Sequence, residues 1–178
     1  MSSPEYRIPF DQDAHPVCVC QGFHGPYHER RGGVLDLAYA VDFALPIGSI
    51  VHCARAGIVR LIRMDSTECY RGMDEQIGSQ YVREGNKIVI EHDDHTFAVY
   101  EHLRRGSSLV RERDTVHVGQ ELAETGESGW MGDITNLHFH VHKWIRPTDD
   151  CPGYNATMPI AFVDYDGPLE HERCVSQQ

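Results

Sequence analysis

Short runs of apolar residues recur along the chain, and clusters of turn-forming residues lie between them. Runs of this kind, rich in β-branched and aromatic side chains, are typical of β-strands. The pattern predicts strands at residues 50–54, 57–62, 87–92, 96–102 and 136–142. Sustained helical periodicity is missing, and only residues 73–82 indicate a short helix. We therefore expect a mainly β protein.

Two stretches lack this alternation. Residues 63–86 are polar and predict a long insertion or surface loop, and residues 145–157 predict a second loop. Residues 158–165 predict one further strand, at an edge. No repeat, low-complexity tract or linker divides the 178 residues, so we expect a single domain over 1–178, with its core at about 17–143 and a C-terminal extension at 145–178.

The charge and hydropathy of the chain narrow the classes of partner. A formal net charge of −11 argues against nucleic acid as the main partner, because an acidic surface repels the phosphate backbone. No apolar run approaches the length that spans a membrane. The first five residues lack the basic and then apolar segments of a signal peptide, so we expect none in this chain.

Three histidines alternate with apolar residues in the segment 136–142 (NLHFHVH). Side chains two residues apart on a strand share a face, so His138, His140 and His142 should form a row with the apolar side chains behind them. Neutral imidazole is the commonest metal ligand at physiological pH, and a packed strand would hold it rigidly. The segment predicts a metal site; the alternative is a solvent-facing strand that is rich in histidine by accident.

Six cysteines are present, and none forms a C-x-x-C pair. Cys18 and Cys20 lie on a probable strand and are poorly placed to bridge each other, although each could reach a cysteine on a neighbouring strand. Cys151 and Cys174 could form a bridge between C-terminal loops. Alternatively, all six are free thiols in a reducing compartment, and the sequence leaves both interpretations open.

Four blocks, in this order, resemble the lysostaphin-type zinc endopeptidases, a family of bacterial cell-wall metallopeptidases with a small antiparallel β core. They are residues 39–51 (YAVDFALPIGSIV), 56–59 (AGIV), 85–92 with 100–103 (GNKIVIEH and YEHL), and 118–129 with 137–141 (VGQELAETGESG and LHFHV). The resemblance covers roughly residues 17–143. It implies the lysostaphin-type peptidase fold, an antiparallel β-sheet or sandwich with long loops.

The resemblance also implies an activity, namely zinc-dependent cleavage of peptide bonds in bacterial peptidoglycan, with one Zn²⁺ per chain. The implied ligands are a histidine, an aspartate and a second histidine, and Asp42 and His138 match the last two. The family's short HxxxD spacing would place the first ligand at Ala38, which cannot bind a metal. The resemblance of the segment 21–28 (QGFHGPYH) to a related family motif therefore implies that His28 is the first ligand, with His24 as the alternative. The family further implies a periplasmic or secreted location.

His102, in the block YEHL, matches a family histidine that positions the zinc water or stabilises the oxyanion of the intermediate. One departure from the family is Asn136, which stands where a second catalytic histidine is expected. An amide orients water but cannot take a proton at neutral pH. His140 or Glu101 could supply the base instead. A register two residues later would make His138 the base and His140 the ligand, and the sequence leaves these alternatives open.

Several further residues carry weaker expectations. Tyr27 and Trp130 could line a shallow groove for an extended peptide, or simply pack. His92 and His95 flank a probable hairpin turn, and we expect both to be solvated. Asn136 and the missing signal peptide favour a second hypothesis, a catalytically degenerate member of the same fold that acts as a binding or regulatory module. A third hypothesis is a zinc-structural protein with a closed four-ligand site.

Overall fold

The computed structural model describes residues 5–28, 37–143 and 157–169. The elements in chain order are β1 (Glu5–Tyr6), β2 (Val19–Gln21), β3 (Val41–Ala44), β4 (Ile50–His52), β5 (Gly57–Arg63), β6 (Cys69–Tyr70), α1 (Glu75–Gly78), β7 (Lys87–Glu91), β8 (Phe97–Glu101), β9 (Thr115–Val116), β10 (Glu121–Glu124), β11 (Gly129–Trp130), β12 (Asn136–His142) and β13 (Ala161–Phe162). The five predicted strands are all present, with ends that agree to within two residues.

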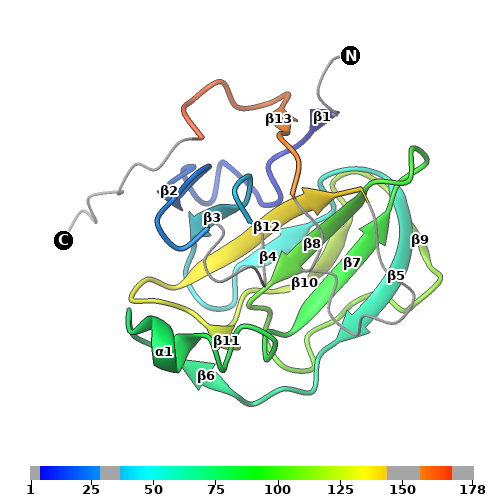
Figure 1. Ribbon diagram of the computed structural model, residues 1–178. Coiled ribbons are helices and arrows are strands. Elements are labelled where there is room, and N and C mark those ends of the chain that lie inside the picture. The colour runs from blue at the N-terminus through cyan, green and yellow to red at the C-terminus, as the bar shows by residue number, and fades with distance from the viewer. Residues whose placement is uncertain (1–4, 29–36, 144–156, 170–178) are drawn as a thin grey trace.

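A seven-stranded sheet forms the body of the protein, in the order β2-β3-β12-β8-β7-β5-β9 (Figure 1). Each neighbouring pair in it is antiparallel. The long strand β12 lies between β3 and β8, where it is paired along both edges. This arrangement confirms the predicted mainly β, antiparallel fold.

Three two-stranded pairs surround the main sheet. β4 pairs antiparallel with β10, while β6 with β11 and β1 with β13 pair in parallel. The predicted helix is reduced to the single turn α1, whose first turn is capped by the Asp74 side chain accepting from the Ile77 amide. The expected C-terminal strand is β13, two residues long. The loop expected at 145–157 lies, apart from its last residue, outside the described residues.

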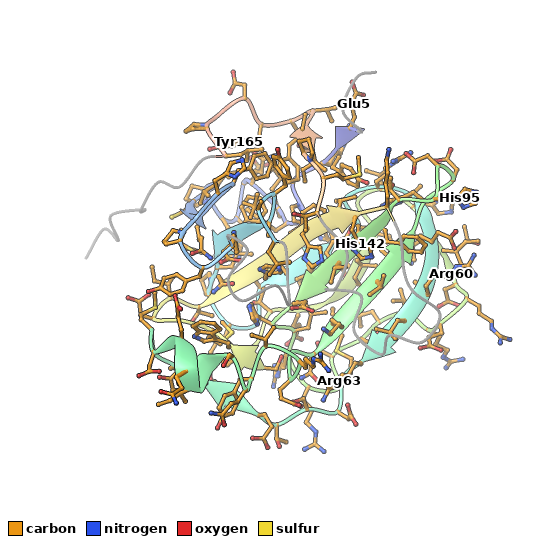
Figure 2. The ribbon with its side chains drawn as sticks, in the orientation of Figure 1. Glu5, Arg60, Arg63, His95, His142 and Tyr165 are labelled. Carbon is orange, nitrogen blue, oxygen red and sulfur yellow. The ribbon has the colours of Figure 1, made fainter. Side chains whose placement is uncertain are left out.

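Strand β12 is buried on both of its faces. Its apolar side chains belong to the hydrophobic core on one side, namely Leu137, Phe139 and Val141. The three histidines alternate with them and are 6%, 2% and 0% exposed at His138, His140 and His142, the last of which is labelled on the strand in Figure 2. The alternative of a solvent-facing histidine strand is therefore wrong.

The pairing register places polar residues of three strands together. His138 on β12 lies opposite Asp42 on β3 and opposite Glu101 on β8. Directly opposed residues on neighbouring strands project to the same face. The imidazole of His138 and the carboxylates of Asp42 and Glu101 therefore lie side by side on the face of the sheet opposite the apolar core.

The apolar core extends beyond the range 17–143. It also includes residues near both ends of the chain, namely Tyr6, Ile8, Phe10, Ile160 and Phe162. The pairing of β1 with β13 joins these two segments. That 1–178 forms a single domain stays a prediction. Over the described ranges, no helix has the length and apolar character that a membrane crossing requires.

The cysteines do not form a uniform set. Cys18 is disulfide-bonded, whereas Cys20, Cys53 and Cys69 are free thiols. The interpretation that all six are free is therefore wrong. The bridge considered between Cys151 and Cys174 concerns residues outside the described part of the chain.

Candidate metal centre

Three predicted metal ligands, His28, Asp42 and His138, come together on the polar side of the sheet. One donor atom of each lies within 4.8 Å of the others, and all three residues are buried. His28 Nε2 lies 3.2 Å from Asp42 Oδ2, and His138 Nδ1 lies 2.7 Å from Asp42 Oδ1. The loop after β2, strand β3 and strand β12 each supply one of them. Both imidazoles thus point a nitrogen at the same carboxylate.

The chemistry of these atoms fits a cation. His28 Nδ1–H donates to the Gly22 carbonyl at 3.1 Å, and this hydrogen bond turns Nε2 toward Asp42. That nitrogen is buried and has no hydrogen-bond partner among the described residues. Burial opposes ionisation of Asp42, but His28 and His138 outweigh it and hold the pKa of the carboxyl below its usual range. A His-Asp-His donor set with one side open is typical of catalytic zinc.

Gln21 orients the carboxylate and was missed by the sequence reasoning. Its amide Nε2 donates to Asp42 Oδ2 at 3.0 Å, and its Oε1 accepts from the Tyr27 backbone amide at 3.2 Å. The residue lies opposite Asp42 in the β2–β3 pair. The available signal was its position at the start of the segment 21–28, which also carries His28.

His102 and Asn136 line the same cleft, which has a volume of about 770 Å³ and contains the three clustered residues. The His102 Nδ1–H donates to the Ser128 carbonyl at 2.8 Å, so its Nε2 keeps a lone pair. Burial, reinforced by His138, lowers the pKa of His102 below the usual value, which keeps the ring neutral at pH 7. His102 can therefore accept a proton or a hydrogen bond within the cleft.

Asn136 is held by two backbone carbonyls. Its Nδ2 donates to Met131 at 3.2 Å and to Ile134 at 2.8 Å. Its Oδ1 is buried and has no hydrogen-bond partner within the described ranges. This oxygen can hold a water by accepting one of its hydrogens, but it cannot remove the proton.

The two alternative bases, Glu101 and His140, have different surroundings. Glu101 lines the cleft and forms an ion pair with Lys87, a lysine that is 1% exposed. Burial raises the pKa of Glu101, but Lys87 and His138 outweigh this and lower it below the usual value. Burial, with His138 and His142, lowers the pKa of His140 well below 6.5. Among the described residues, the cluster with Asp42 contains His138 and not His140.

The other histidines are placed as follows. His24, the alternative ligand, is exposed, packs edge-on against Tyr39 and lies outside the cluster. The His95 side chain is 83% exposed, as expected. The expectation for His92 is wrong, since that residue is 2% exposed and its Nδ1–H donates to the Ala56 carbonyl at 2.8 Å. Its ring packs edge-on against Tyr6 of β1, with the centroids 5.4 Å apart, so a segment distant in sequence covers it.

Residues 73–83, within the stretch expected to be an insertion or surface loop, supply one wall of the cleft. Tyr27 and Trp130 both line the cleft, and their rings pack edge-to-face with centroids 5.8 Å apart. The Trp130 Nε1–H donates to the Gly72 carbonyl at 2.8 Å. A Cβ on Gly78 would come within 2.2 Å of the Trp130 ring, so only glycine lets α1 approach the indole this closely.

The model of peptidase family M23 matches residues 37–150, a range that contains Asp42, His102, Asn136 and His138 but begins after His28. The lipoprotein NlpD/LppB homolog of Pseudomonas aeruginosa is 38% identical over 65 residues, which are 36% of this chain and 20% of that protein. Lipoprotein NlpD of Yersinia enterocolitica is 37% identical over 57 residues, which are 32% of this chain and 55% of that protein. These alignments therefore span between a fifth and about half of the relatives' length.

Solved structures with the same fold include peptidases. A zinc containing peptidase from Vibrio cholerae superposes with a TM-score of 0.53 and 26% identity, covering 78% of this chain and 37% of that chain. Lysostaphin from Staphylococcus simulans superposes with a TM-score of 0.54 and 19% identity, covering 84% of this chain and 50% of that chain. These likenesses confirm the fold that the sequence blocks predict.

Proposed function

Because this chain belongs to peptidase family M23, we propose that it is a zinc-dependent metalloendopeptidase that cleaves peptide bonds of bacterial peptidoglycan. His28, Asp42 and His138 are the proposed ligands of one Zn²⁺ per chain. The observation that carries the proposal is the meeting of their three donor atoms, within 4.8 Å, in a cleft that also contains His102.

The side chains around the cleft have separate roles in this proposal. When bound, zinc polarises the scissile carbonyl and lowers the pKa of the attacking water. His102 Nε2, whose lone pair is set by the Nδ1–H bond to Ser128, accepts the proton of that water or, once protonated, donates to the oxyanion. Asn136 orients the water through Oδ1. Glu101 is less suited as the base, because Lys87 neutralises it.

The proposed substrate is an extended peptide of small residues in a peptidoglycan stem or cross-bridge. Tyr27 and Trp130 flank the cleft with largely apolar surfaces, against which a peptide backbone can lie. We place the protein in the cell envelope, outside the cytoplasm, because both curated relatives bear the name lipoprotein.

Metal content and peptidoglycan hydrolysis, measured on the same samples of the full chain, test the proposal. We expect one zinc per chain, release of peptide fragments from isolated cell walls, loss of both after dialysis against a chelator, and recovery when zinc is returned. A chain that binds no zinc would contradict the ligand assignment. Zinc without hydrolysis, on walls with several cross-bridge types, would contradict the enzymatic activity and support the second candidate.

The second candidate is a binding or regulatory module of the same fold, and Asn136 is the observation that favours it. A histidine at this position would add a group able to take a proton. We expect Asn136→His to raise the hydrolysis rate by about tenfold, below the 10²–10⁴-fold range of a fully evolved acid or base. Asn136→Gln, which enlarges the side chain without adding a base, is the control and should show no gain. If the wild type did not hydrolyse peptidoglycan and Asn136→His did, the result would support the binding or regulatory module.

A further inference from the structure

His138 has a second polar contact that the proposed mechanism does not use. Its Nε2 lies 2.9 Å from Nδ1 of His140, two residues further along β12. The ring centroids are 5.1 Å apart and the planes meet at 73°, which lets one ring direct a nitrogen at the edge of the other. Both residues are buried, at 6% and 2% exposure. A hydrogen bond here requires one ring to donate and the other to accept.

The proposed zinc site decides which ring donates. Nδ1 of His138 is the nitrogen that faces Asp42, so it must keep its lone pair if it is to bind a metal. A neutral imidazole carries one hydrogen, which then lies on Nε2 and is donated to His140 Nδ1. The 2.7 Å contact between His138 Nδ1 and Asp42 Oδ1 is a hydrogen bond that Nδ1–H donates, and zinc binding would have to replace that hydrogen. An acceptor at His140 therefore favours the tautomer that can bind zinc.

We propose that His140 is a positioning residue, which holds His138 in the tautomer and ring orientation that zinc binding requires. The inference rests on the proposed zinc site and adds to it a residue that does not touch the metal. Metal-bound histidines commonly donate their second N–H to such a partner, and its loss weakens metal affinity. Here the partner is an imidazole on the same strand.

His142 is a matched control on the same strand and the same face. It is 0% exposed, lies 5.7 Å from His140 between ring centroids and stacks on Phe97. Neither of its ring nitrogens has a hydrogen-bond partner in the described part of the chain. Replacing it disturbs the packing of the row while leaving the contact between His138 and His140 in place.

Zinc affinity of the full chain, measured by competition with a chromophoric chelator, tests the inference. His140→Met and His140→Gln have nearly equal volume, but only glutamine offers a strong acceptor. We expect His140→Met to bind zinc about 10–100-fold more weakly than the wild type and His140→Gln to recover most of that loss. His142→Met should bind within about threefold of the wild type, since it lies outside this contact.

The absorption spectrum of the cobalt-substituted protein, which reports ligand geometry, should change in His140→Met and not in His142→Met. Circular dichroism of each metal-free variant shows whether the fold is kept. Equal zinc affinity in His140→Met and His140→Gln would overturn the inference, as would an equal loss in His142→Met. A wild type without zinc would instead overturn the proposed metal site, so the two failures are distinguishable.

Discussion

Replacing His138 with alanine is expected to abolish zinc binding and peptide hydrolysis together. The substitution leaves two of the three clustered donors, His28 and Asp42. Two ligands do not hold catalytic zinc, which takes three from the protein. The loss of affinity should exceed the roughly 10–100-fold that removal of an outer partner costs. Zinc content per chain and fragment release from cell walls are the measurements.

His24→Ala is the matched control for this variant. His24 belongs to the same segment as His28 but is exposed and lies outside the cluster, so zinc and hydrolysis should both persist. If His138→Ala kept one zinc per chain, the ligand set would have to be shifted toward His140. If His24→Ala lost zinc, the alternative ligand would replace His28 in the proposal.

Replacing His102 with alanine should separate metal binding from catalysis. The side chain lines the cleft beside His138, with ring centroids 5.8 Å apart, but does not belong to the clustered donors. We expect kcat to fall by about 10²–10³, the cost of removing one group that stabilises the developing charge, while zinc content stays at one per chain. Steady-state kinetics on a peptidoglycan peptide, with metal analysis of the same samples, measure this.

His95→Ala serves as the control for the His102 variant, because that side chain is 83% exposed in the hairpin before β8. Its kcat should match the wild type. Loss of zinc in His102→Ala would show that the residue supports the metal rather than the reaction. An unchanged kcat would move the proton transfer to another group, and Glu101 would then be the next residue to replace.

Part of the site follows from patterns that are local in sequence. The alternation along 136–142 is sufficient to predict a strand with an apolar face and a histidine face, since strand periodicity depends only on neighbouring residues. Asp42 and His138 were identified because each lies inside a block that resembles the family, and the structure places them side by side. Their role as metal ligands stays a prediction.

Other features depend on how the loops are placed in the folded chain, which no local sequence pattern predicts. His24 and His28 share one loop, and both were named. Only the folded chain shows that the bond from His28 to the Gly22 carbonyl turns this ring toward Asp42, while His24 faces outward. The burial of His92 was missed for the same reason, because its neighbour Tyr6 comes from a distant segment.

The sequence by itself determined the β class of this protein, four strands of its seven-stranded sheet, the family it resembles and the residues proposed as metal ligands. The tertiary structure brought the expected ligand His28, rather than His24, next to Asp42. It alone decided that Gln21 orients the carboxylate and that Lys87 neutralises Glu101. It also decided that residues of α1 and Trp130 line the cleft. The physical reason is that strand character arises from adjacent residues, whereas these contacts join segments that only the packing of the whole sheet brings together.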